Sequence, residues 1–359
     1  MSARSSAGRP LVRLALLALM VAALAPAPVL SQTVRAATQP PGGEPPGAVT
    51  LRDGVVVDAA AGRAFVASRD GGVEAIDLVS GQPRWATDEA AKPLFAASGT
   101  LLAQRTPTEQ GSLALALVDA GSGRIRTETS VAIEPDLWAS VEDRPASVFR
   151  SSATADAAGG VVLAWSHTTA PEGGALRGYL PSEQEGLAPT LDGDEQRLGA
   201  GQRGEIVERT GAVRIDLATG TVTTPGARLR AAAGAVGAGT VRAGTFLPDV
   251  DGRQLMSADG RHVLVSQRIE QPADPWSVYR WSIYERTGDL VGSFESAISM
   301  SPFVVDRDGV VFVHPPGLVN TAEGLVEQPL SLQKVDARSG TRLWARSIRE
   351  LEYRGPMAP

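Results

Sequence analysis

The residues that could perform acid–base or metal chemistry in this chain are few and scattered. His167, His262 and His314 are its only histidines, and each lies on or at the end of a different segment that predicts a β-strand. A metal centre or an assisted general base needs several such groups within reach of one another, and no two of these histidines stand at a paired spacing. We interpret them as packed or surface histidines, with a metal ligand or general base as the alternative.

Carboxylates are more numerous, and three clusters could bind a cation. Asp249-Val250-Asp251-Gly252 and Asp306-Arg307-Asp308-Gly309 begin like calcium loops, but neither continues with the full set of ligands that an EF-hand loop requires, ending in Glu at position 12. We interpret both as hairpin turns, which need no metal. Asp192-Gly193-Asp194-Glu195 lies in a long polar stretch, and predicts a solvated acidic loop rather than a cation site.

Other catalytic groups have little support. The chain contains no cysteine, which excludes thiol catalysis, thiolate metal sites, disulfides and a lipid anchor on an N-terminal cysteine. No serine stands in a Gly-x-Ser-x-Gly elbow. Trp276 and Trp281 flank a turn that contains a proline, where packing is favoured over stacking on a ligand. We therefore predict no catalytic, cofactor-binding or metal-binding residues and no cofactor.

The elements that would position any site follow from an internal repeat. Residues 75–85 read AIDLVSGQPRW, and residues 334–344 read KVDARSGTRLW. In both, an apolar-alternating run ends in Asp, a Ser-Gly follows after two residues, and a Trp stands four residues beyond the Gly. The Asp can accept hydrogen bonds from the turn that it opens, and the Gly supplies a positive φ. The Trp offers a flat anchor for a neighbouring sheet, so the pattern predicts β-hairpins that stack.

Weaker copies lie between these two. Residues 118–123 and 215–220 keep Asp-x-x-Ser/Thr-Gly but place Thr127 and Thr224 where the Trp stands, and residues 284–288 lose the Asp as well. The predicted structural residues of the repeat are Asp77, Gly81, Trp85, Asp119, Gly123, Asp216, Gly220, Gly288, Asp336, Gly340 and Trp344.

This repeat resembles that of the quinoprotein-type (PQQ-like) β-propellers. The family includes quinone-dependent dehydrogenases and smaller, non-enzymatic exported members, among them the propeller lipoprotein of the outer-membrane barrel-assembly machinery. The resemblance implies an all-β fold, a single propeller of four-stranded antiparallel blades, for which the length predicts six or seven blades within a range of five to eight. The repeat residues build blades rather than sites, so the resemblance implies less about activity.

The chain in order supports this architecture. Four short strands are predicted between residues 55 and 87, and four more between residues 302 and 347, with residues 315–329 as a loop within the last blade. Further strands are predicted over 95–127, 148–166, 205–224 and 256–294. Residues 171–204 are long, polar and rich in Gly and Glu, and we expect them to form an insert. The propeller is expected to span residues 49–359.

The N-terminus predicts export. Three arginines precede the apolar run 14–24, which is too short to span a bilayer, and residues 1–31 are typical of a cleaved signal peptide, with a retained anchor as the alternative. Residues 32–48 are rich in Pro and Gly and predict a tether. Loss of the three arginines takes the net charge from −6 to −9, which does not favour nucleic acid or anionic membrane surfaces.

These observations favour one functional hypothesis over two others. We expect an exported, periplasmic or secreted, non-catalytic propeller that acts as a protein-interaction or ligand-binding scaffold in the cell envelope. The expected partner is an unidentified envelope or secreted protein, and the chain is expected to be a monomer with no stable membrane span after signal removal. A hydrolase or sugar-binding module that uses the central channel is the alternative. A quinone-dependent dehydrogenase is disfavoured, because the resemblance implies a longer chain with a vicinal Cys pair for such enzymes.

Overall fold

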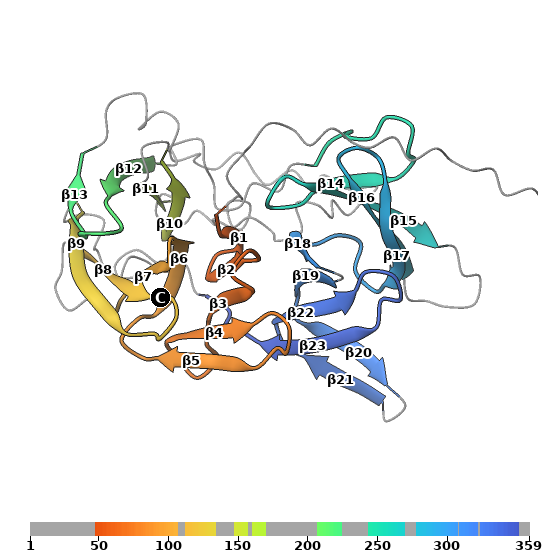
Figure 1. The fold of residues 1–359 in the computed structure, drawn as a ribbon, viewed down its shortest axis with the longest axis horizontal. Coiled ribbons are helices and arrows are strands. Elements are labelled where there is room, and N and C mark those ends of the chain that lie inside the picture. Colours follow the sequence, from red (N-terminus) through yellow and green to blue (C-terminus); the bar gives the residue numbers. More distant parts are fainter. Residues whose placement is uncertain are drawn as a thin grey trace, which may run out of the picture. The chain divides into compact units, whose positions relative to one another are not determined.

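The computed structural model describes residues 47–106, 112–133, 147–156, 160–169, 207–224, 243–269, 278–307, 309–321 and 324–351. The chain divides into two compact units, Met1–Glu44 and Pro45–Pro359, and all the described residues belong to the second. Within them every regular element is a β-strand (Figure 1). The all-β prediction is confirmed.

Apart from one separate two-stranded hairpin, the described strands form five antiparallel sheets in chain order, each the size of a propeller blade (Figure 1). The first sheet consists of β1 (Val49–Arg52), β2 (Val55–Asp58), β3 (Arg63–Ala67), β4 (Val73–Asp77) and β5 (Pro83–Thr87). The second consists of β6 (Lys92–Ala97), β7 (Thr100–Gln104), β8 (Ser112–Asp119) and β9 (Ile125–Ala132). The third consists of β10 (Ser147–Ala155), β11 (Val161–Thr169), β12 (Val207–Ile215) and β13 (Val222–Thr223).

The fourth sheet consists of β14 (Arg253–Met256), β15 (His262–Ile269), β16 (Val278–Glu285) and β17 (Leu290–Ser296). The last consists of β18 (Phe303–Asp306), β19 (Gly309–His314), β22 (Ser331–Asp336) and β23 (Arg342–Ser347). A separate hairpin, β20 (Gly317–Thr321) and β21 (Gly324–Gln328), lies between β19 and β22 in the chain. The four-stranded blades are thus those of a β-propeller, and the described residues contain five of the five to eight expected.

The residue pattern of each strand matches how far the strand is buried in its sheet. The middle strands β3 and β7 are buried on both faces, because sheets pack against them from both sides, and they read as nearly continuous apolar runs. The outer strand β9, Ile125–Ala132, instead alternates exposed and partly buried residues along most of its length. The hairpin into the outer strand also carries a one-residue register shift in four of the five sheets, at residues 75–76, 117–118, 283–284 and 334–335.

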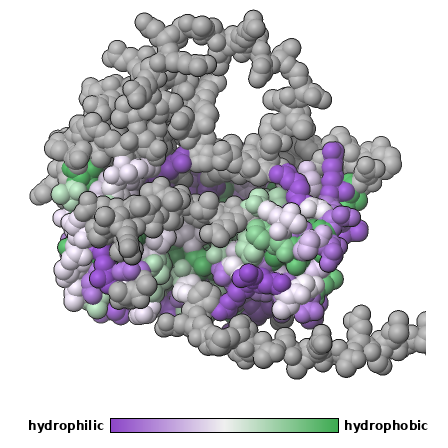
Figure 2. All heavy atoms as spheres, turned by 90° about the horizontal axis from the view of Figure 1, so that it is seen from above, coloured by the Kyte–Doolittle hydropathy of each residue, from purple (hydrophilic) through white to green (hydrophobic). Residues whose placement is uncertain are grey.

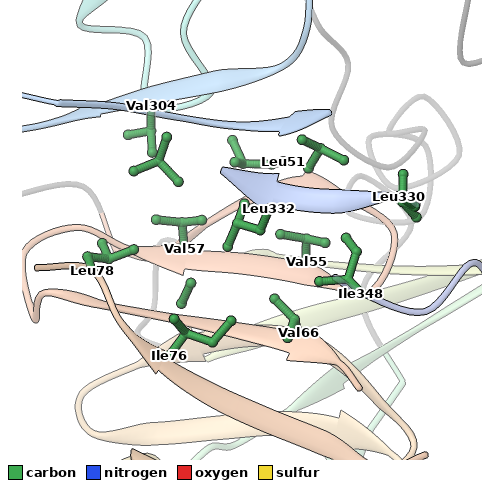
Figure 3. Close-up of a cluster of buried hydrophobic side chains, with 13 residues drawn as sticks. Leu51, Val55, Val57, Val66, Ile76, Leu78, Val304, Leu330, Leu332 and Ile348 are labelled. Atoms are coloured by element: carbon green, nitrogen blue, oxygen red, sulfur yellow. The ribbon is translucent and has the colours of Figure 1, made fainter. Parts of the chain in front are cut away.

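The first and last sheets share one hydrophobic cluster. Leu51, Val57 and Ile76 of the first sheet pack with Val304 and Leu332 of the last (Figure 3). Beyond β23 the chain continues along the first sheet, where Ile348 forms a β-bridge with Ser68 and Arg349 N–H donates to Ala67 O over 3.0 Å. The first and last sheets, far apart in sequence, therefore contact one another through side chains and two backbone contacts.

The other interfaces between sheets follow chain order. Separate apolar clusters join the first sheet to the second, the second to the third, and the fourth to the last. β1 is a fifth strand on the inner edge of the first sheet, and it contacts both β6 and β19. Ala48, at the end of the predicted tether, is already buried in the cluster between the first two sheets.

One prediction is wrong and several lie outside the described residues. Residues 315–329, predicted as a loop, contain the β20–β21 hairpin, whose five residue pairs run from Gly317↔Gln328 to Thr321↔Gly324. The prolines of this segment, Pro315, Pro316 and Pro329, flank the hairpin at both ends. The signal peptide, most of the tether and the 171–204 insert are outside the described part of the chain.

Candidate functional site

The repeat aspartates hold the turns into the outer strands. Asp77 Oδ1 accepts from the backbone N–H groups of Val79, at 2.9 Å, and Ser80, at 2.8 Å, and also from the Ser80 hydroxyl. The same three bonds recur at Asp119, Asp216 and Asp336. The glycine four residues after each Asp has φ between 68° and 76°, as a left-handed position requires: Gly81, Gly123, Gly220 and Gly340.

These hydrogen bonds keep the aspartates ionised. Backbone donation from Ser80, followed by the Arg84 guanidinium, lowers the pKa of Asp77 from 3.8 to about 2. The Ser122 hydroxyl and then Arg126 lower the pKa of Asp119 to about 2. The pKa values of Asp216 and Asp336 are also lowered, chiefly by the backbone N–H three residues on. Carboxylates that accept this many bonds stabilise turns and are poorly suited to abstract protons.

The tryptophans of the repeat join neighbouring sheets. Trp85, on β5, donates from Nε1 to Ala120 O of the second sheet over 3.1 Å. Trp344, on β23, donates to Leu78 O of the first sheet over 3.0 Å. Each indole lies directly on the turn glycine of the neighbouring sheet, Gly123 under Trp85 and Gly81 under Trp344, where a Cβ would overlap the ring.

At two further interfaces between sheets, other residues occupy the position of the docking Trp. Thr127 lies on Gly220, whose added Cβ would stand 2.7 Å from the Thr127 methyl. In the fourth sheet the turn after Glu285 is one residue shorter, so Gly292 occupies the position of the Trp and approaches Ala337 O directly. Phe294, two residues on, packs on Gly340 instead. Gly288 has φ of 94°, with no described atom within 4 Å of an added Cβ.

Buried ion pairs form a second set of contacts between and within sheets. Lys92 Nζ of the second sheet lies 2.8 Å from Asp53 Oδ1 in the β1–β2 turn. Lys334 Nζ lies 2.6 Å from Asp306 Oδ2 and also donates to Leu78 O, at 3.1 Å. Lysine heads are seldom buried unless they are paired, and these two are less than a tenth exposed. Lys334 and Asp306 are 28 residues apart in the sequence, and Lys92 and Asp53 are 39 apart, so sequence spacing could not reveal these pairs.

A third ion pair joins the last sheet to the first. Arg346 on β23 forms two-pronged hydrogen bonds with Glu74 on β4, at 3.0–3.2 Å, and Ser68 Oγ donates to the same carboxylate at 3.0 Å. Glu74 is buried within the first sheet, so the Arg346 guanidinium supplies its charge partner from the last sheet. This bidentate geometry is the strong form of an arginine–carboxylate contact.

The residues first considered for chemistry are not brought together. His262 starts β15 and His314 ends β19, in different sheets, and burial lowers the pKa of both. His167 lies on β11 of the third sheet. Asp249 and Asp251 are exposed near β14, far along the chain from Asp306 and its lysine. The described residues contain no group of three or more acidic or histidine side chains placed to hold a metal.

Trp281 is fully buried and donates from Nε1 to Ile298 O over 2.9 Å, which confirms packing rather than ligand stacking. Trp276, Asp308 and the acidic run 192–195 lie outside the described residues. In the part of the chain that the structure describes, no helix is long and apolar enough to cross a bilayer.

The surface offers one feature that belongs to no blade. β20 and β21 pair only with each other among the described strands, and the hairpin extends past its own blade (Figure 1). Val326 on β21 is 48% exposed, one of four large apolar side chains exposed in the described residues, with Val79, Leu290 and Leu343. The face drawn in Figure 2 mixes hydrophilic and hydrophobic areas. The hairpin is therefore the best candidate for a binding surface.

No protein-family model matches the chain, and no curated protein matches it. Among solved structures it is similar to the quinohemoprotein alcohol dehydrogenase ADHIIG from Pseudomonas putida HK5, with 12% identity over 82% of this chain and 58% of that one, and a TM-score of 0.22. It is also similar to a europium-containing methanol dehydrogenase, at 12% identity, 85% and 53% coverage and a TM-score of 0.24.

The β-propeller domain of Cps50 (Swd1) from Myceliophteria thermophila gives 10% identity, 86% and 89% coverage and a TM-score of 0.22. The chain spans less than two thirds of the length of either dehydrogenase. Likenesses this distant have no bearing on activity. The propeller architecture rests on the blades themselves.

Proposed function

We propose that the protein is an exported, non-catalytic β-propeller that holds another protein of the cell envelope. The observation that carries the proposal is the β20–β21 hairpin, an added pair of strands whose outer edges pair with no other described strand. Such edges are suited to protein recognition, because an extended partner segment can pair with them.

The use of the buried polar groups supports the same proposal. Lys92, Lys334 and Glu74 are each paired with an opposite charge or hydrogen-bonded across a sheet interface. The repeat aspartates accept bonds from their own turns, and the docking indoles donate to carbonyls. These groups hold blades together, which is the chemistry of a rigid scaffold rather than of a reaction centre.

The inner edge of the first sheet favours a scaffold over a channel enzyme. β1 lies there, with Leu51 buried against the last sheet and Asp53 paired with Lys92 of the second. A ligand that approached the first sheet from its inner edge would meet this packed strand. The position in the cell envelope is proposed on the N-terminal segment alone, whose arginines and short apolar run are typical of a signal peptide.

The proposal is tested in cells that express the full chain with an affinity tag at its C-terminus. The exported product is expected to begin near Gln32 by mass spectrometry, and cross-linking in intact cells is expected to join it to a specific envelope protein. A product that retains Met1 in the cytosol would contradict export. A purified chain that turns over a substrate with no cross-linked partner would contradict the scaffold role.

A further inference from the structure

We infer that β20 is the docking edge for an extended segment of a partner protein, which adds as a third strand next to the β20–β21 hairpin. The inference rests on the proposed function and deepens it by naming the edge and the chemistry of the occupant. Its starting point is that an isolated two-stranded ribbon is at best marginally stable in water, whereas three strands can be stable.

First, β20 lacks the usual protection of an edge strand. Natural edges are guarded by charges, prolines, bulges or shortness. β20 reads Gly-Leu-Val-Asn-Thr, with no charge and no proline, and its pairing with β21 has no register shift. The outer strands of four blades carry charges instead: Arg84 on β5, Arg126 and Glu128 on β9, Glu295 on β17, and Arg342 and Arg346 on β23. The outer strand of the third sheet, β13, has only two residues.

Second, the last blade is complete without the hairpin. His314, the last residue of β19, pairs directly with Ser331, the first of β22. Two strands in such register could be joined by a short turn. Instead the chain makes an excursion between Pro315 and Pro329, and prolines at both ends prevent the excursion from continuing the ladder of the blade. The ribbon is thus an addition to a complete blade.

Third, the charge of the hairpin segment favours a basic occupant. Residues 315–329 contain Glu323 and Glu327 and no lysine, arginine or histidine. Glu327 is exposed on β21 and pairs in register with Leu318, so it lies two strand spacings, or roughly 9–10 Å, from a strand added at the other edge of β20. Over about one Debye length its carboxylate still attracts a lysine or arginine side chain of the added strand and repels an acidic one. The fitting occupant is an extended segment of β-branched residues flanked by lysine or arginine.

The same charges argue against a second copy of this chain. Two ribbons that met edge to edge through β20 would form one sheet that carries Glu327 of both copies, on chains that each have a net charge of −6. A ladder of five residues would also bury far less than the roughly 1,200 Å² of a stable dimer.

The test measures binding of a synthetic peptide, Lys-Thr-Val-Thr-Val-Thr-Lys, to the full chain by fluorescence anisotropy, with a Glu-flanked version as the control. We expect the Lys-flanked peptide to bind, and hydrogen exchange to slow at β20 amides. The main variant replaces Gly317–Gln328, whose ends pair in register, by an Asn-Gly turn. Peptide affinity is expected to fall at least about tenfold while the melting temperature is unchanged.

A point variant keeps the test decisive if that deletion misfolds. Asn320→Lys places a cation on β20 and should weaken the Lys-flanked peptide, while Arg84→Lys on the outer strand of the first blade should not. Equal binding by the hairpin-less variant, equal binding of both peptides, or exchange protection on another strand would each overturn the inference. A dimer lost with the hairpin, seen by light scattering, would make a second copy the occupant and also overturn it. If the cross-linked envelope partner persists without the hairpin, the inference fails while the proposed function stands.

Discussion

The contact of Trp85 with Gly123 allows the docking of one blade on the next to be measured. Gly123 has φ of 76°, and a Cβ there would stand 2.7 Å from the Trp85 ring. Gly123→Ala should therefore lower the free energy of unfolding for two reasons. An L-residue in the left-handed region costs about 1–2 kcal/mol, and overpacking against the indole costs a further 1–3 kcal/mol or so. The expected loss in free energy of unfolding is thus about 2–5 kcal/mol.

Gly62 is the matched control. Its φ is 64°, and no described atom lies within 4 Å of an added Cβ, so Gly62→Ala should cost only the backbone part, about 1–2 kcal/mol. Trp85→Ala should cost about 2–4 kcal/mol, because the half-buried indole loses one hydrogen bond and part of its aromatic contact. In the Trp85→Ala background the overlap disappears, so Gly123→Ala should then cost no more than Gly62→Ala.

The assay is equilibrium unfolding in urea, followed by far-ultraviolet circular dichroism so that loss of the indole does not alter the signal. The four chains of the cycle give the coupling energy between Trp85 and Gly123, expected to be about 1–3 kcal/mol. The docking model is refuted if Gly123→Ala and Gly62→Ala cost the same. It is equally refuted if the cost of Gly123→Ala is undiminished when Trp85 is absent.

Three further predictions follow from other contacts. Lys334→Met leaves Asp306 charged and buried, and should lower the free energy of unfolding in urea by about 3–5 kcal/mol. The double variant Lys334→Met with Asp306→Leu should lose less. A double variant that is less stable than the single variant would contradict this prediction. The pKa values of Asp77 and Asp119 are lowered to about 2, so the stability that these carboxylates contribute is present above pH 4 and lost as the pH falls towards 2. Asp119→Asn should therefore make the free energy of unfolding fall less steeply over this pH range. An unchanged dependence on pH would contradict this prediction. Titration with pyrroloquinoline quinone and calcium should show no stoichiometric binding and no dye-linked alcohol oxidation, and either signal would contradict the non-catalytic proposal.

Local sequence patterns predicted much of the fold. The turn of Asp77 and Gly81 involves residues within five positions, so its hydrogen bonds and positive φ could be predicted from the string itself. The strands of the first and last blades follow from apolar runs between turn residues, and their positions in the structure agree with that prediction. The β20–β21 hairpin was missed because its flanking prolines favour a loop, although Leu-Val recurs in both of its strands.

The role of Trp85 and Trp344 as anchors between sheets was predicted from the repeat, but the partners of the contacts between blades were not. Phe294 takes the docking role in the fourth sheet because the turn after Glu285 is one residue shorter and Gly292 falls where the Trp would be. That substitution becomes visible only when the strand register is known. The pairs of Lys334 with Asp306 and of Arg346 with Glu74 depend likewise on which strands become neighbours.

The sequence by itself therefore determined the repeat, the turns and the strand content, because these depend on backbone preferences and hydrogen bonds among residues close in the chain. The tertiary structure alone decided which carbonyl each indole reaches and which charges are buried together. It also decided that the first and last sheets meet, and that the β20–β21 ribbon pairs with no other described strand. Each of these depends on distances between residues far apart in sequence, and such distances are set by how the sheets pack.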